Sequence, residues 1–83
     1  MNVVVWVKPN CVQCDSTKRY LTKHDIPFES KDMTPEMIEE FKDKGFMSAP
    51  VVQTSKDTWA GFRMSKLEGL VKEYKSEQIH KSA

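Results

Sequence analysis

Two cysteines, Cys11 and Cys14, are separated by two residues and directly follow a short apolar run, and the chain has no others. This spacing lets two sulfurs alternate between a dithiol and a disulfide. A disulfide needs Cβ atoms about 3.5–4.5 Å apart, whereas residues three apart within a helix have Cβ atoms about 5–6 Å apart. The difference closes when the first cysteine stands at the start of a helix, where the backbone is not yet fixed. We therefore expect Cys11 to begin a helix and Cys14 to lie one turn inside it.

Such a helix start gives the two sulfurs different environments. The sulfur of Cys11 meets unpaired backbone N–H groups and the positive end of the helix dipole, and it can accept from the amide of Gln13 or Cys14. Lys8 adds a nearby positive charge. These features favour the Cys11 thiolate, which is the form that reacts with disulfides, whereas Asp15 opposes it. Cys14 is expected to be more enclosed and less ionised.

This asymmetry predicts a mechanism. The Cys11 thiolate attacks a substrate disulfide and forms a mixed disulfide with it. Cys14 then attacks Cys11 and releases the reduced substrate. Val12 and Gln13 stand between the cysteines, so they are expected to tune the redox potential of the pair.

The residues around this pair alternate between strand and helix signals. The apolar run before the cysteines is typical of a buried strand, which Pro9 and Asn10 end. Thr34 followed by Pro35 is typical of a helix start. In chain order, the expected elements are a strand at residues 2–7, a helix that carries residues 16–23, a strand at 26–33, a helix from Thr34 to a stop at Gly45, a strand at 49–54, a turn at 55–57, a strand at 58–62, and a last helix capped by Ser65 with Leu67, Leu70, Val71 and Tyr74 on its buried side.

The order β-α-β-α-β-β-α places the chain in the α/β class. A strand-helix-strand unit implies a right-handed crossover between parallel strands, and the short turn makes the last two strands an antiparallel hairpin. We therefore expect a four-stranded mixed sheet with helices on both faces. With 83 residues, the chain can build one modest core. Residues 1–75 are expected to form a single domain, and residues 76–83 to fray as a C-terminal tail.

The composition narrows the classes of function. The 13 basic and 12 acidic side chains nearly cancel, and no basic tract suggests a nucleic-acid partner. The longest apolar stretch, residues 3–7, is far too short for a membrane span or a signal peptide. These features predict a cytoplasmic protein. A structural disulfide tends to be reduced in the cytosol, so a close cysteine pair there is expected to be catalytic or metal-binding.

Several segments together resemble the NrdH-redoxin family of glutaredoxin-like small redoxins. The resemblance covers nearly the whole chain up to residue 75. It rests on a strand followed by Lys8-Pro9-Asn10-Cys11-Val12-Gln13-Cys14 and a helix, then Ala49-Pro50-Val51-Val52, then Trp59-Ala60-Gly61-Phe62-Arg63.

This resemblance implies a thioredoxin fold and dithiol reduction of class Ib ribonucleotide reductase. It also implies that electrons come from NADPH through thioredoxin reductase, with no bound cofactor besides the redox-active pair. Pro50 should be cis and lie beside the cysteines, and the backbone of Ala49 should pair with an extended substrate segment. A monomer is expected.

A glutathione-dependent glutaredoxin is the alternative within the same fold. Glutaredoxins that bind glutathione usually carry a Thr-Val-Pro loop and a Gly-Gly pair followed by an acidic residue. This chain has Ser48-Ala49-Pro50 and Ala60-Gly61-Phe62-Arg63 at those places, which weakens the glutathione interpretation. NrdH-redoxins often continue Phe-Arg with Pro-Asp, whereas this chain continues with Met64-Ser65. How tightly this loop is held and which partner the chain prefers therefore stay open.

Two further alternatives come from other classes. A structural zinc site needs four ligands, and only His24 and His80 are available to join the cysteines. A metal or iron–sulfur cluster shared between two chains stays open, although no metal ligand is assigned. The last alternative is a plain interaction domain with incidental cysteines.

The other candidate residues carry both a structural and a functional interpretation. Lys8 is a site charge or a solvated loop charge, and Trp59 and Phe62 pack in the hairpin or face a partner. Arg63 is expected to pair with a carboxylate, with a partner contact as the alternative. The residues expected to bind a partner or shape the site are Lys8, Val12, Gln13, Ala49, Pro50, Trp59, Phe62 and Arg63.

Overall fold

The computed structural model describes residues 2–82, with the side chains described up to residue 76. The chain folds in the order β1 (Val4–Val7), α1 (Val12–Lys23), β2 (Glu29–Asp32), α2 (Pro35–Asp43), β3 (Val51–Gln53), β4 (Thr58–Ala60) and α3 (Met64–Ser82). This order confirms the expected β-α-β-α-β-β-α arrangement.

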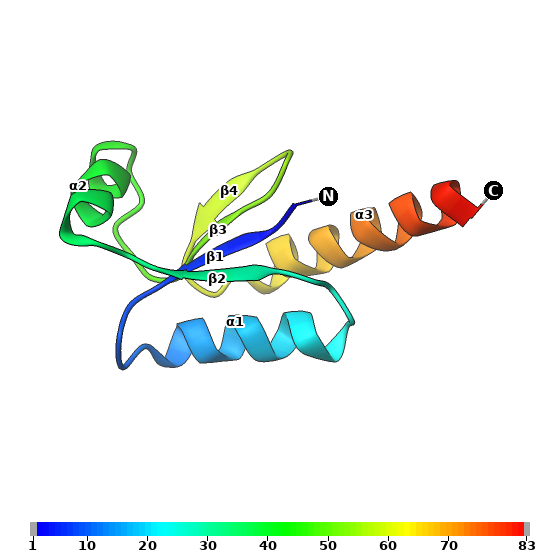
Figure 1. Cartoon of the computed structure of the whole chain (residues 1–83), viewed down its shortest axis with the longest axis horizontal. Helices are drawn as coiled ribbons and strands as arrows, with labels where there is room; N and C mark the ends of the chain where they lie inside the picture. Colours follow the sequence, from blue (N-terminus) through cyan, green and yellow to red (C-terminus); the bar gives the residue numbers. More distant parts are fainter. Residues whose placement is uncertain (1, 83) are drawn as a thin grey trace.

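The four strands form one mixed sheet in the order β2-β1-β3-β4. β1 and β2 are parallel, and β1–β3 and β3–β4 are antiparallel pairs. Figure 1 shows α1 on one side of the sheet and α2 on the other. The mixed four-stranded sheet with helices on both faces is therefore confirmed.

The alternation of β1 divides its side chains between the two faces of the sheet. Val5 and Val7 are buried in the core cluster, together with Cys14 and Leu21 of α1 and Leu67 of α3. This face of the sheet therefore holds the main core, and one of the two cysteines is part of it.

Trp6 of β1 belongs to the opposite face. Its ring lies edge-on to Phe41 of α2, with centroids 5.8 Å apart, and its indole N–H donates to Oε1 of Gln53 at 2.8 Å. The Nζ of Lys31 lies 5.5 Å from the ring centroid, within the range of a cation–π contact. Trp6 thus connects α2 to three strands.

Helix boundaries follow the local signals in α1 and α2. Cys11 is the N-cap of α1, as expected. Thr34 caps α2 by accepting from the amide of Met37 at 3.2 Å, and Pro35 occupies the first turn. Gly45 follows α2 at φ +89°, in the left-handed region that glycine tolerates.

The expected cap of the last helix was wrong. α3 begins at Met64, so Ser65 lies inside its first turn. The amide of Leu67 donates to the carbonyl of Arg63, which makes Arg63 the residue at which the helical hydrogen bonds begin. The helix extends to Ser82, but the side chains of residues 77–83 lie outside the described part, so the expected fraying of residues 76–83 stays a prediction.

All four strands are shorter than expected, and β1 begins at Val4 instead of residue 2. β2 begins at Glu29, and all four of its residues are exposed. It is an edge strand that only β1 pairs. Ile26, expected in the strand, is instead buried in the connection, where its amide donates to the carbonyl of Leu21. β3 begins only after Pro50, and β4 ends at Ala60 because Gly61 turns the chain at φ +82°.

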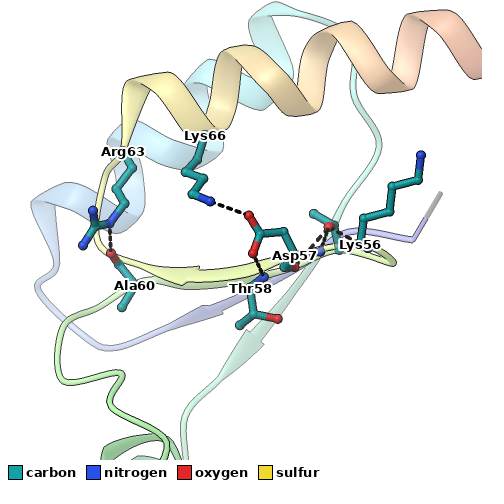
Figure 2. Close-up of polar contacts among 7 residues, drawn as sticks. Lys56, Asp57, Thr58, Ala60, Arg63 and Lys66 are labelled. Carbon is teal, nitrogen blue, oxygen red and sulfur yellow. Dashed lines mark hydrogen bonds and ion pairs between the residues drawn. The ribbon is translucent and has the colours of Figure 1, made fainter.

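The β3–β4 hairpin is tied to α3 by a charged contact. The carboxylate of Asp57 accepts from Nζ of Lys66 at 2.6 Å and from the amide of Thr58 at 2.8 Å (Figure 2). These two hydrogen bonds, the one from Lys66 first, lower the pKa of Asp57. The same figure shows Nε of Arg63 donating to the carbonyl of Ala60 at 3.2 Å.

We predict that this contact makes stability depend on pH in the acid range. A lowered pKa means that the folded state favours the Asp57 carboxylate, so its contribution is present above the usual aspartate pKa and is lost as the pH falls through the folded value. Asp57→Asn should therefore lower the urea midpoint at about pH 6, and the difference from wild type should shrink towards about pH 2.

The control is Glu39→Gln on the exposed part of α2, which should show little difference from wild type over this range. A gap between Asp57→Asn and wild type that stays constant with pH would contradict the assigned ion contact.

Candidate active site

Cys11 stands at the turn between β1 and α1. Asn10 before it has φ +56°, a left-handed conformation that asparagine adopts more readily than most residues. Cys11 itself is extended, with φ −110° and ψ +106°, and its sulfur accepts from the amide of Cys14 at 3.1 Å. The expected amide contact is confirmed for Cys14. A sulfur therefore occupies the capping position that serine, threonine or aspartate usually fills.

Cys11 and Cys14 form a disulfide, with Cα atoms 5.2 Å apart. The Cys14 side chain is 2% exposed and belongs to the core cluster, whereas Cys11 is half-buried and packs against the edge of that cluster. Val12 between them is 79% exposed. The expected difference in enclosure is confirmed, and an incoming molecule can approach the sulfur of Cys11 more readily than that of Cys14.

Thr17 holds the first turn of α1 and was not anticipated from the sequence. Its side chain is fully buried, and its hydroxyl donates to the carbonyl of Gln13 at 2.8 Å. The amide of Asp15 donates to the carbonyl of Cys11 at 3.2 Å. A threonine four residues after Gln13 on the buried face of a helix was the available signal. Both contacts fix the backbone that carries the disulfide.

The loop before β3 forms a second side of the site. The peptide bond between Ala49 and Pro50 is cis, as the resemblance implied. Pro50 is buried, and its carbonyl accepts from the amide of Gly61 at 2.7 Å. Ala49 is half-buried against the same core cluster that Cys11 borders. Met47 in this loop is 74% exposed.

The turn after β4 forms the third side. The Oε1 of Gln13 accepts from the amide of Phe62 at 3.1 Å. A Cβ added to Gly61 would lie 3.3 Å from that oxygen and 3.8 Å from Cβ of Ser48. The segments around Gln13, Ser48 and Gly61, which are far apart in the sequence, therefore meet at Gly61, and the residue that joins the cysteine motif to this meeting point is Gln13.

The structure places three further candidate site residues. Trp59 is 5% exposed and packs in the core cluster, so it offers almost no surface to a partner. Arg63 donates to the carbonyl of Ala60 instead of the carboxylate that we expected. Lys8 lines a small recess with Met47 and Ser48.

Metal ligands do not gather in the described part of the chain. Within residues 2–76, whose side chains the structure describes, no group of three or more histidine, cysteine, aspartate or glutamate side chains could hold a metal ion. His24 lies at the far end of α1, where its ring contacts Tyr20, and His80 falls outside the described side chains. Among the helices of the same residues, none combines the length and apolarity of a membrane span.

Comparison with known proteins identifies the family. The family model for glutaredoxin matches residues 3–58. The glutaredoxin-like protein NrdH of Lactococcus lactis subsp. lactis is 39% identical over 70 residues, which cover 82% of this chain and 97% of the relative. The chain belongs to the NrdH-redoxin family of glutaredoxin-like proteins.

Two further NrdH proteins agree with this assignment. The NrdH protein of Salmonella typhimurium is 34% identical over 65 residues, covering 76% of this chain and 80% of the relative. The solved structure of the NrdH-redoxin from Escherichia coli superposes with a TM-score of 0.79 at 32% identity, covering 84% of this chain and 95% of that one. This NrdH-like protein is therefore a glutaredoxin-like thiol–disulfide oxidoreductase with a thioredoxin fold and a Cys11–Cys14 pair.

We predict that the two cysteines of the reduced NrdH-like protein react at different rates. Cys11 is the more accessible, and its position at the helix start favours the thiolate. Iodoacetamide at neutral pH should therefore modify Cys11 about tenfold faster than Cys14, measured by mass spectrometry of tryptic peptides.

The matched comparison is between Cys14→Ser and Cys11→Ser, each of which leaves one thiol. Equal rates in the two variants would show that the helix start does not activate Cys11.

Proposed function

We propose that this NrdH-redoxin is an electron carrier in the cytoplasm that reduces class Ib ribonucleotide reductase. Thioredoxin reductase, with NADPH as the source of electrons, returns it to the dithiol. The observation that carries this proposal is the capping of α1 by the more accessible sulfur of Cys11, with Cys14 enclosed one turn later. The solved Escherichia coli relative, described as having a thioredoxin-like activity profile, supports it, as does the resemblance of the segments around both loops.

Two exchange steps transfer the electrons. In the reduced protein, the Cys11 thiolate attacks one sulfur of the substrate disulfide, and the other substrate sulfur leaves as a thiolate that takes a proton from water. Cys14 then loses its proton and attacks the sulfur of Cys11. The second substrate sulfur leaves and is protonated, so two electrons have passed from the cysteine pair to the substrate.

The capping contact supports both directions of this exchange. The amide of Cys14 donates to the sulfur of Cys11 at 3.1 Å in the disulfide state. The same donor can stabilise the negative charge on that sulfur when it attacks a substrate and when thioredoxin reductase expels it. No resident cofactor is needed, because the cysteine pair itself holds the electrons.

The contacts of the loop after β4 argue for thioredoxin reductase over glutathione. The amide of Phe62 is already occupied by Gln13, so it is not free for a ligand carboxylate. Arg63 stands where the acidic residue of glutathione-binding glutaredoxins is expected. These contacts favour a protein as the source of electrons.

The test of this function is a coupled assay with two sources of electrons. NADPH with thioredoxin reductase should sustain turnover of class Ib ribonucleotide reductase by this protein, and glutathione with glutathione reductase should not. NADPH oxidation and deoxyribonucleotide formation are the two measurements. Turnover with glutathione alone would replace the proposal with the glutaredoxin alternative.

Single cysteine variants should separate the two roles. Cys11→Ser should lower the coupled rate to about 1% of wild type or less, because the attacking sulfur is lost. Cys14→Ser should lose turnover as well but accumulate a mixed disulfide through Cys11, visible by non-reducing electrophoresis and reversed by dithiothreitol. Full turnover by Cys14→Ser would contradict the division of labour.

A further inference from the structure

The Gln13 side chain makes the hydrogen bond that joins the cysteine motif to the distant turn after β4. Its Oε1 accepts from the amide of Phe62 at 3.1 Å, across 49 positions of sequence. Because a backbone N–H can only donate, the atom that faces it is the oxygen, and this fixes the orientation of the amide group. The rest of the residue is held by Thr17, which donates to the carbonyl of Gln13.

Gly61 allows this approach. A Cβ at residue 61 would lie 3.3 Å from Oε1 of Gln13, and its φ of +82° is a conformation that other residues rarely adopt. The amide of Gly61 also donates to the carbonyl of Pro50. Through these contacts, Gln13 connects the cysteine motif, the cis-proline loop and the turn after β4.

Apolar residues that are next in sequence to Gln13, Ser48 and Gly61 are exposed or half-buried. Val12 and Met47 are 79% and 74% exposed, and Phe62 is half-buried. They come from the three segments that meet at Gly61. A polypeptide substrate can contact all three segments at once, whereas a small disulfide needs only the sulfur of Cys11.

We propose that Gln13 is a positioning residue that selects protein disulfides over small ones. By holding the amide of Phe62, it keeps the turn after β4 in the position where a polypeptide chain docks beside Cys11. This inference rests on the proposed exchange chemistry of the cysteine pair. It predicts that loss of the acceptor oxygen slows reaction with a protein disulfide and leaves reaction with a small disulfide nearly unchanged.

The test compares two substrates in single turnovers. The protein is reduced chemically and freed of reductant, so the result does not depend on which reductase serves it. Second-order rate constants are measured with insulin and with the uncharged 2,2′-dithiodipyridine. Their ratio cancels any change in the thiolate fraction of Cys11, because both substrates react with the same sulfur.

Gln13→Met removes the acceptor oxygen but keeps a side chain of similar length, whereas Gln13→Glu keeps an acceptor oxygen. Gln13→Met should lower the insulin-to-dipyridyl ratio about fivefold, the amount expected from one hydrogen bond. It should also speed hydrogen exchange of the Phe62 amide. Gln13→Glu should restore both the ratio and the protection of that amide.

Gln53→Met is the matched control, because Oε1 of Gln53 also accepts a hydrogen bond, from Trp6 on the opposite face of the sheet. It should leave the ratio unchanged. A Gln13→Met ratio within twofold of wild type, or unchanged exchange of the Phe62 amide, would overturn the positioning role. Loss of reaction with both substrates in the wild type would instead refute the proposed exchange chemistry.

Discussion

The hydrogen bond from the amide of Cys14 to the sulfur of Cys11 is the contact on which the rest of the site depends. It begins α1, brings the two cysteines into bonding distance and directs an N–H dipole at the sulfur that is more exposed. A hydroxyl or carboxylate at residue 11 would also cap the helix, but it would contribute no thiol chemistry. The sulfur of Cys11 thus both caps the helix and is the group that attacks in the proposed reaction.

The apolar core contributes both to the stability of the fold and to the difference in reactivity between the two cysteines. Cys14 lies among Val5, Val7, Leu21 and Leu67, so the apolar contacts that hold α1 and α3 against the sheet also enclose the second sulfur. Thr17 adds a polar contact to the same turn of α1, where its hydroxyl is satisfied by the carbonyl of Gln13. The difference between the two cysteines follows from where the helix sits on the sheet, and no separate structure is needed to produce it.

Local signals in the sequence predicted those parts of the structure that depend on neighbouring residues. The caps at Cys11 and Thr34 and the β3–β4 hairpin were predicted because each depends on residues within one turn. The burial of Trp59 was one of two interpretations left open, and the packing of the hairpin in the core cluster decided between them. The contact of Arg63 with the carbonyl of Ala60 was not predicted, because the residue types alone do not say whether an arginine donates to a carbonyl or to a carboxylate. The Gln13–Phe62 contact spans distant segments, and only the folded chain brings its two partners together.

Ser65 shows the same limit of prediction from local sequence at the start of α3. Its residue type suits a cap, but the turn at Gly61 sets the direction of the chain, and the helical hydrogen bonds begin at Arg63. The cis bond before Pro50 was expected only from the family resemblance, because most bonds before proline are trans. Tertiary packing thus decided the features that single-residue preferences left open.

The polar contacts around β4 have a consequence for behaviour at high concentration. The outward amide of Thr58 is bonded to Asp57, and the outward carbonyl of Ala60 is bonded to Arg63. An unprotected edge strand offers such groups to strands of other molecules and can seed aggregation. At the opposite edge, β2 exposes the charged side chains of Glu29, Lys31 and Asp32, which also discourage strand addition. Bonded backbone groups at one border of the sheet and charged side chains at the other thus disfavour strand addition by other copies of the chain.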